Sequence, residues 1–269
     1  MSSQSPPQLP QPGLGTSGHE GESCTDAVVT ALKSGYRHID TAQLYDNEEA
    51  VGRALEQADV DREEVFLATK VHPSNLAAED VLESTRESLD RLGVDTVDLL
   101  YVHWPMGEYD AEETLPAFDE AVEEGLTRHV GVSNFTPNLL EEAVSMLDAP
   151  IVAHQIELHP ELQQDELVSL GREHDVQTVA YCPIAKAEVA EIDVLQEIAD
   201  NHDATPIQVA LAWQYDREGV VPIPKGTGEH IHENYEAHEI ELTDDDRDRI
   251  ADLDAGERLV DPDDAAWNQ

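Results

Sequence analysis

Four side chains of this chain have the types needed to move a proton onto a substrate. They are an acid, a phenol, an amine and an imidazole: Asp40, Tyr45, Lys70 and His103. A lysine ammonium close to a phenol stabilises the phenolate, so Lys70 is expected to lower the pKa of Tyr45 from its usual value of about 10. A tyrosine tuned in this way can act as a general acid near neutral pH. Asp40 would be the counter-ion of Lys70, and His103 would hydrogen-bond the atom that Tyr45 protonates.

Lysine is scarce in this sequence, which makes the position of each lysine informative. The chain has Lys33, Lys70, Lys186 and Lys225 in 269 residues. Lys70 ends the apolar run FLATK, and Lys225 ends the run VVPIPK. Polar residues follow strands in any protein, but this tendency explains two such lysines poorly in a chain so poor in lysine. We therefore interpret both as candidate site residues.

Short apolar, β-rich runs alternate with helical runs along the whole chain. Strands are expected over residues 13–16, 38–40, 65–71, 97–103, 129–132, 151–155, 178–181 and 220–223. Helices are expected over residues 26–34, 48–56, 79–92, 113–123, 138–147, 164–174, 206–215 and 244–253. This alternation predicts parallel strands with right-handed crossovers. Eight such units predict an α/β fold, a (β/α)8 TIM barrel in a single domain, with an open doubly wound sheet as the alternative.

Polar residues stand at the ends of the predicted strands. A barrel enzyme has its site at the carboxyl ends of its strands. The residues at those ends are Thr16, Asp40, Lys70, His103, Ser133, Asn134, Gln155, Tyr181 and Lys225. We expect them to surround one site, with Tyr45 reaching over it from just beyond the second strand.

The two ends of the chain differ from the middle. Residues 1–12 are polar and rich in proline, and we expect them to be disordered. The barrel is expected to span residues 13–259. Residues 260–269 are acidic and are predicted to form a loose tail.

The charge of the chain is extreme, with 59 acidic residues against 15 basic ones and a net charge of -44. Nucleic acid and anionic membranes would repel it. Apolar residues make up 40% of the chain, so a folded protein from a salt-adapted (halophilic) source is expected; an acidic protein of ordinary salinity is the alternative. No run of about 18 apolar residues occurs, and the start lacks the regions of a signal peptide, so we expect a cytoplasmic protein.

Several local signals are weak. Gly13, Gly15 and Gly18 spell the dinucleotide fingerprint G-x-G-x-x-G, but the long strand that must precede it is missing. Cys24 and Cys182 cannot form a disulfide framework, and neither they nor the histidines have the spacing of metal ligands. We expect no Rossmann site and no metal.

Several motifs in order resemble the aldo-keto reductase family closely, over residues from about Gly13 to about Leu253. They are GYRHIDTAQLYDNEEAVGRAL at 35–55, FLATK at 66–70, VHWP at 102–105, GVSNF at 131–135, AYCPIA at 180–185 and IPK at 223–225. The resemblance is greatest to a short prokaryotic branch that includes 2,5-diketo-D-gluconate reductases. It implies a (β/α)8 barrel that reduces aldehydes or ketones to alcohols with NADPH. The natural substrate stays open, with a sugar-derived dicarbonyl or methylglyoxal as examples.

The resemblance also implies roles for individual residues. Tyr45 would be the general acid, Lys70 and Asp40 would tune it, and His103 and Trp104 would contact the substrate. NADPH, or NADH as a weaker alternative, would be bound by Gly15, Thr16, Asp40, Ser133, Asn134, Gln155, Tyr181, Cys182, Ile184, Lys225, Gly226, Thr227, His230 and Asn234. In this set, Ser133, Asn134 and Gln155 would hold the nicotinamide carboxamide and Tyr181 would stack on its ring. Lys225 would meet the 2'-phosphate.

The sequence departs from the family pattern at several points. Ser17 stands where many members have an aromatic residue, Gly226 replaces a serine after Lys225, and His230 replaces an arginine. The phosphate site therefore carries less positive charge, and the pocket is expected to be open. The amino-terminal hairpin that usually plugs the barrel floor is expected to be absent or reduced.

Two classes of function remain. The first is an NADPH-dependent reductase, and the second is a cofactor-binding regulatory protein of the same fold with slow or no turnover. The four residues Asp40, Tyr45, Lys70 and His103 favour the enzyme, because a protein that only binds would not need all of them. A monomer acting on a small carbonyl compound is expected.

Overall fold

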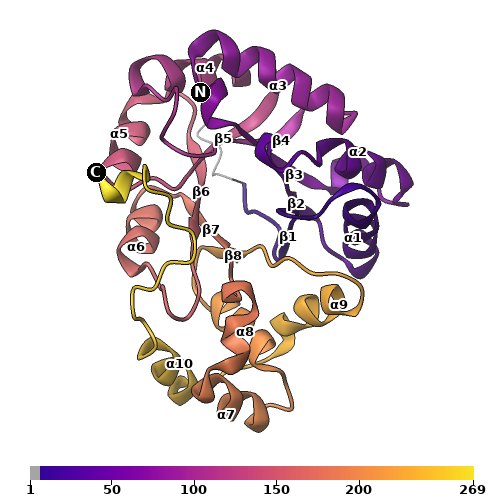
Figure 1. The fold of residues 1–269 in the computed structure, drawn as a ribbon, viewed down its shortest axis with the longest axis vertical. Coiled ribbons are helices and arrows are strands. Elements are labelled where there is room, and N and C mark those ends of the chain that lie inside the picture. The colour runs from indigo at the N-terminus through magenta and orange to yellow at the C-terminus, as the bar shows by residue number, and fades with distance from the viewer. Residues whose placement is uncertain (1–6) are drawn as a thin grey trace.

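The computed structural model describes residues 7–269 and shows a barrel of parallel strands surrounded by helices (Figure 1). In these residues the strands are β1 (Gly13–Gly15), β2 (His38–Asp40), β3 (Phe66–Val71), β4 (Val97–Val102), β5 (Thr127–Ser133), β6 (Ile151–Glu157), β7 (Gln177–Tyr181) and β8 (Val220–Pro222). Each strand pairs with the next one in sequence, in the order β1 to β8. The open doubly wound alternative is excluded, because its strand order would reverse partway through the sheet. The (β/α)8 prediction is confirmed.

The barrel closes at a seam between β8 and β1. The backbone N–H of Gly15 donates to the carbonyl of Pro224 at 3.3 Å. A Cβ atom on Gly15 would lie 2.8 Å from the carbonyl oxygen of Ile223, so a side chain at this position would clash with the backbone of the neighbouring segment. Glycine is therefore required here by the approach of the two edges, whatever else it contacts.

The helices cover the outside of the barrel (Figure 1). They are α1 (Gly21–Ser34), α2 (Glu48–Gln57), α3 (Ala78–Leu92), α4 (Ala111–Glu123), α5 (Pro137–Met146), α6 (Asp165–Glu173), α7 (Asp193–Asn201), α8 (Pro206–Tyr215), α9 (Glu229–Glu236) and α10 (Asp244–Ala251). The predicted helices are confirmed to within a few residues, except that α1 begins at Gly21 and not at residue 26. Helices α7 and α9 were not expected. In this part of the chain no helix is long and apolar enough to cross a membrane.

The amino-terminal end of the barrel is closed by residues 7–12. Leu9 is 2% exposed and packs among the residues that fill the barrel, including Leu99 and Val152. Its N–H donates to Oε1 of Gln177 at 3.1 Å, and Nε2 of Gln177 donates to the carbonyl of Pro7 at 2.8 Å. The expectation of a disordered segment is wrong for residues 7–12, because an apolar side chain and paired backbone groups hold them. Residues 1–6 lie outside the described part.

The carboxyl-terminal residues 260–269, expected to form a loose tail, pack against the barrel. The N–H groups of Leu259 and Val260 donate to the carboxylate of Glu157 at 2.7 and 3.0 Å. Ala265 is fully buried, and the last turn, η6 (Ala266–Asn268), follows it. Glu157 lies at the carboxyl end of β6, so the tail is attached at the end of the barrel that carries the predicted site.

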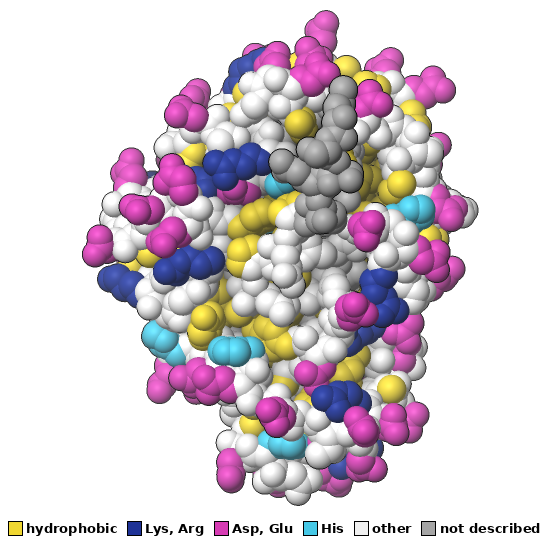
Figure 2. Space-filling view, turned by 180° about the vertical axis from the view of Figure 1, so that it is seen from behind, with side chains coloured by type: hydrophobic (Ala, Val, Ile, Leu, Met, Phe, Trp, Pro, Cys, Tyr) yellow, Lys and Arg dark blue, Asp and Glu magenta, His cyan; other side chains and the backbone are white. Residues whose placement is uncertain are grey.

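Acidic side chains are spread over the surface. Figure 2 shows one face, on which Asp and Glu are distributed around the edge with Lys and Arg between them. This distribution agrees with the spacing of acids along the sequence, and no single acidic tail accounts for the net charge of -44.

Candidate active site

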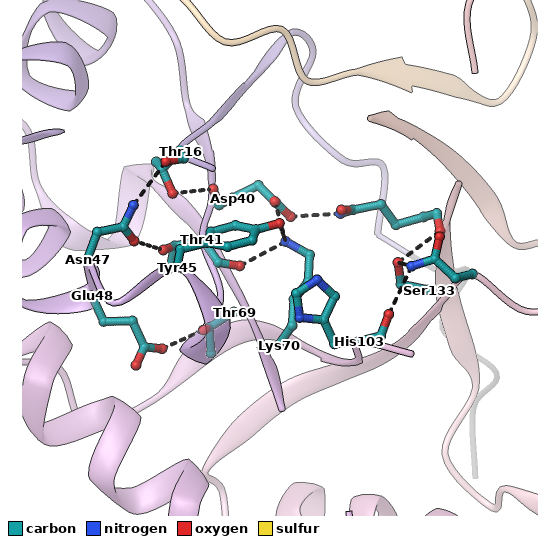
Figure 3. Close-up of polar contacts among 12 residues, drawn as sticks. Thr16, Asp40, Thr41, Tyr45, Asn47, Glu48, Thr69, Lys70, His103 and Ser133 are labelled. Carbon is teal, nitrogen blue, oxygen red and sulfur yellow. Dashed lines mark hydrogen bonds and ion pairs between the residues drawn. The ribbon is translucent and has the colours of Figure 1, made fainter. Parts of the chain in front are cut away.

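Lys70 is the centre of the group of catalytic candidates (Figure 3). Its side chain is 0% exposed and lies near the end of β3. The ammonium forms an ion pair with the carboxylate of Asp40, the last residue of β2. It also donates to the carbonyl of Thr41 at 2.9 Å and to the hydroxyl of Tyr45 at 3.3 Å. All three ammonium protons are therefore engaged, and the orientation of Lys70 is fixed.

Tyr45 and His103 lie side by side. Tyr45 ends the turn η1 (Gln43–Tyr45), and His103 directly follows β4. Their rings meet edge to face, with centroids 5.6 Å apart and planes at 83°. Burial and the nearby Lys70 lower the pKa of His103 well below its usual value. His103 is therefore a neutral hydrogen-bonding group at neutral pH, next to the phenol.

The pKa of Tyr45 is raised, and the expected lowering is wrong in direction. Burial raises the pKa, while the charge of Lys70 and its hydrogen bond lower it. Loss of hydration outweighs the ammonium, in part because Asp40 also raises the pKa. Tyr45 stays protonated at neutral pH, so it is available as a proton donor.

A second cluster joins the ends of β5, β6 and β7. Nε2 of Gln155 donates to the free carboxylate oxygen of Asp40 at 2.8 Å, and the hydroxyl of Ser133 donates to the carbonyl of Gln155 at 3.0 Å. Nδ2 of Asn134 donates to the carbonyl of His103 at 3.0 Å, and the hydroxyl of Tyr181 donates to Oδ1 of Asn134 at 2.8 Å. Hydrogen bonds therefore join five predicted residues, and Asp40 links them to Lys70. The five are His103, Ser133, Asn134, Gln155 and Tyr181.

Asn134 has a backbone conformation that few residue types adopt. Its φ angle is +64°, in the left-handed region where asparagine is tolerated better than most residues. In this turn the N–H of Asn134 donates to the carbonyl of Gln155 at 3.0 Å. Its side chain donates to His103, just after β4, and accepts from Tyr181 of β7. Cys182, with a φ of +49°, follows Tyr181 in a similar turn, and Ile184 packs against the nearby core.

The third group of predicted residues lies after β8, away from the catalytic candidates. Gly226 packs closely against α9: a Cβ there would lie 3.3 Å from the side-chain amide of Asn234. Lys225 and Thr227 are exposed, and among the described residues no carboxylate lies within 4.0 Å of the Lys225 amine. His230 is bonded to Glu233 at 2.8 Å.

Gly18 belongs with this third group, although its G-x-G-x-x-G motif does not follow the long strand of a Rossmann site. A Cβ on Gly18 would lie 3.3 Å from Nζ of Lys225, so the loop after β1 approaches the segment after β8. Thr16 precedes it and is buried, with its hydroxyl donating to the carbonyl of Asp40 at 3.0 Å.

Asn47 is a buried residue that sequence reasoning missed. Its Nδ2 donates to the carbonyls of Thr16 and His19 at 2.9 and 3.0 Å. Its Oδ1 accepts from the hydroxyl of Thr41 at 2.7 Å. Asn47 therefore connects the loop after β1 to the backbone that Lys70 contacts (Figure 3). Its place two residues after Tyr45 was the available signal.

Trp267 in the tail and Arg258 shortly before the tail are two further residues that were missed. The ring of Trp267 lies 5.6 Å from that of Trp104, centroid to centroid, and the guanidinium of Arg258 lies 4.1 Å from the Trp267 centroid. Trp104 itself is almost fully buried next to His103. The signal in the sequence was a tryptophan in an otherwise acidic tail, because such a large apolar side chain indicates that the tail packs against the protein.

The sequence profile described as the Aldo/keto reductase family matches residues 12–255. This chain belongs to that family. It is 41% identical over 258 residues to methylglyoxal reductase DkgB of Escherichia coli O157:H7, covering 94% of this chain and 96% of that protein. As an aldo-keto reductase, the chain is an oxidoreductase, and relatives of this kind are named for carbonyl reduction.

Solved structures agree with this assignment. One named 2,5-diketo-D-gluconic acid reductase B superposes with a TM-score of 0.93 at 35% identity, covering 96% of this chain and 92% of the other. An aldo-keto reductase of Bombyx mori, solved in complex with NADP, superposes with a TM-score of 0.87 at 29% identity, covering 95% and 92%. Aldo-keto reductases typically use NADP(H).

The residues present in this aldo-keto reductase fit such a cofactor. A phosphate needs a cation that is not already neutralised, and the exposed Lys225 amine meets this requirement. The first residues of α9 lie beside Gly226, and the cap residue Gly228 leaves the helix amides without a side-chain partner. The N–H groups of His230 and Ile231 donate to the carbonyls of Thr227 and Gly228 at 3.2 and 3.3 Å, so what α9 offers an anion is the positive end of its dipole. Asn134, Gln155 and Tyr181 supply amides and a ring at the other end.

Proposed function

We propose that this aldo-keto reductase reduces a small aldehyde or ketone to the alcohol with NADPH, and that Tyr45 donates the proton. The observation that carries the proposal is the set of three contacts of the Lys70 ammonium: to Asp40, to the backbone of Thr41 and to the Tyr45 hydroxyl. This arrangement holds the phenol in place. The ammonium also stabilises the negative charge that the phenol acquires when it loses its proton.

The chain's own groups act on the carbonyl oxygen. The Tyr45 hydroxyl and the neutral His103 ring are both able to hydrogen-bond that oxygen and orient the carbonyl carbon. NADPH, when bound, supplies the hydride. As negative charge develops on the oxygen, Tyr45 transfers its proton to it, and Lys70, paired with Asp40, stabilises the resulting phenolate. The proton and the hydride together convert the carbonyl to an alcohol.

The remaining residues are proposed to bind the cofactor. Ser133, Asn134 and Gln155 would hold the nicotinamide carboxamide, Tyr181 would stack against the ring, and Lys225 would contact the 2'-phosphate. The other members of the set are Gly15, Thr16, Asp40, Cys182, Ile184, Gly226, Thr227, His230 and Asn234. NADH would bind more weakly, since it lacks the phosphate.

The substrate class is also part of the proposal. The relative from Escherichia coli is named for methylglyoxal, and the solved structure is named for a diketo acid of a sugar. A small dicarbonyl or sugar-derived carbonyl therefore suits this chain. We further propose that it works as a monomer in a cytoplasm of high salt concentration, where NADPH is available.

Replacing Tyr45 with phenylalanine tests the role of the phenol. Tyr45→Phe removes the proton donor and keeps the ring, so kcat for methylglyoxal should fall by about 10²- to 10⁴-fold while the Kd for NADPH stays within about twofold. Oxidation of NADPH followed by absorbance gives kcat, and fluorescence titration gives Kd. Retention of more than half of the wild-type kcat would rule out this assignment. A wild-type chain that binds NADPH but reduces no carbonyl would favour the regulatory alternative.

A further inference from the structure

In the part of the chain that the structure describes, no carboxylate lies within 4.0 Å of the Arg258 guanidinium, although the chain has 59 acidic residues. In residues 7–269, nine other arginines lie within 4.0 Å of an aspartate or glutamate oxygen. Arg37 instead donates to the backbone carbonyls of Leu32 and Tyr36. The polar contact of Arg258 is a long one, from Nη2 to Oε1 of Gln164 at 3.4 Å. Its guanidinium therefore keeps most of its donors available.

Arg258 is close to the candidate active site. It stacks on Trp267, which contacts Trp104, and Trp104 directly follows His103. Its charge acts to lower the pKa of Tyr181, although burial raises that pKa more strongly. The guanidinium thus lies within electrostatic reach of the ring proposed to stack on the nicotinamide.

A cavity of about 460 Å³ is lined by Asn134, Trp267 and Arg258 among other residues, and Asn134 donates to the backbone carbonyl of His103 at 3.0 Å. None of Asp40, Tyr45, Lys70 and His103 lines it. The contacts that connect this cavity to the catalytic group are those of Arg258 with Trp267 and of Trp267 with Trp104, the residue after His103.

Acidic residues line the same cavity without neutralising Arg258. They are Glu157, Asp165, Glu166 and Asp254. Glu157 accepts two backbone N–H groups, Asp165 pairs with an arginine at 2.6 Å, and Asp254 accepts a backbone N–H at 3.1 Å. No oxygen of these four residues lies within 4.0 Å of the Arg258 guanidinium, since no such ion pair occurs in residues 7–269.

The backbone beside Arg258 is held in place. Leu259 and Val260 follow it directly, and both donate to Glu157, whose side chain is 0% exposed. Nζ of Lys186 adds a bond to the carbonyl of Leu259 at 3.2 Å. A guanidinium on a fixed backbone, stacked on a ring, loses little freedom when it binds an anion.

We propose that Arg258 binds a carboxylate on the carbonyl substrate, so that the enzyme prefers aldehyde or keto acids to neutral carbonyl compounds. A planar guanidinium forms two parallel hydrogen bonds with a carboxylate, which fixes orientation as well as position. The inference rests on the proposed reductase function and deepens it. It separates this chain from a reductase built for neutral methylglyoxal, which has no group for Arg258 to bind.

Succinic semialdehyde and its methyl ester test the proposal, because they differ in charge and share the aldehyde. The wild type should have the higher kcat/KM for the acid. Arg258→Gln should lower kcat/KM for the acid by about 10- to 100-fold, mainly through KM, and change that for the ester by less than about threefold. Arg258→Lys should restore part of the loss for the acid. Arg53→Gln, at an exposed position on α2, changes the net charge equally and should leave both substrates unaffected.

Two results would overturn the assignment of Arg258: an equal loss for acid and ester in Arg258→Gln, or no loss for either. Melting temperature and the Kd for NADPH identify a variant that has lost its fold. If Arg258→Gln has lost it, the test uses Arg258→Lys, and the measured quantity is the ratio of kcat/KM for the acid to kcat/KM for the ester. If the acid and the ester are both reduced without any dependence on Arg258, the inference fails and the reductase function stands. If the wild type reduces neither these substrates nor methylglyoxal, the proposed function fails as well.

Discussion

At the scale of single residues, the surroundings of a group decide its chemistry more than its type does. The pKa of Tyr45 was expected to fall because of Lys70, yet burial raises it. The same burial lowers the pKa of His103, and Lys70 adds to that effect. The Tyr45 phenol and the His103 imidazole therefore remain neutral at neutral pH. The charges beside them are those of the Lys70–Asp40 ion pair. The sequence predicts which groups meet, but the balance between desolvation and charge depends on packing.

Lys225 makes a testable case at this scale. It is the residue proposed to distinguish NADPH from NADH, and its neighbour His230 is already bonded to Glu233. Lys225→Met should weaken NADPH binding by about 10- to 100-fold, the value of one charge-assisted hydrogen bond, and hardly change NADH binding. Fluorescence titration of both cofactors measures this. Lys33→Met, an exposed lysine at the end of α1, is the matched control. Equal weakening of both cofactors by Lys225→Met would show that Lys225 does not bind the phosphate.

At the scale of elements, the barrel and its strand ends were predictable from sequence and the two chain ends were not. Strands such as β4, with the sequence VDLLYV, are mostly apolar, and the polar residues at their carboxyl ends mark the site directly. Leu9 and Trp267 lie in polar, proline-rich or acidic segments, where local composition favours disorder. What holds them is a partner far away in sequence, Gln177 for the first segment and Glu157 for the second. Composition carries no information about such partners.

Asn47 illustrates how one loop positions another. Asn47→Asp keeps the acceptor for Thr41 but removes both donors, and places a charge near the carbonyls of Thr16 and His19. We expect kcat/KM to fall by about 10- to 100-fold, with a higher Kd for NADPH, since two hydrogen bonds are lost. Asn138→Asp, exposed on α5, makes the same chemical change and should behave like the wild type. A normal Kd and kcat in Asn47→Asp would contradict this role.

At the scale of the whole molecule, the net charge of -44 should make stability depend on salt. Carboxylates spread over the surface repel one another, and the range of that repulsion shrinks from about 10 Å at 0.1 M salt to about 3 Å at 1 M. The thermal midpoint should therefore rise steeply over this interval of KCl, as measured by circular dichroism. A neutral osmolyte at equal osmolality should not reproduce the rise. A flat midpoint would contradict adaptation to high salt.

The seam between β8 and β1 makes the barrel a split ring. Residues proposed to contact the cofactor stand on both sides of the split, with Gly15 and Thr16 on one edge and Lys225 on the other. A dinucleotide bound across the seam would hold the two edges together, so β1 and β8 could separate only after the dinucleotide dissociates. Amide hydrogens of β1 and β8 should exchange with solvent sooner than those of β4, and NADP⁺ should slow that exchange selectively. At 100 times its Kd, the cofactor would add about 2.7 kcal/mol to the stability of the closed ring. The enzyme would therefore be more stable with its cofactor bound, during turnover, than when it is free.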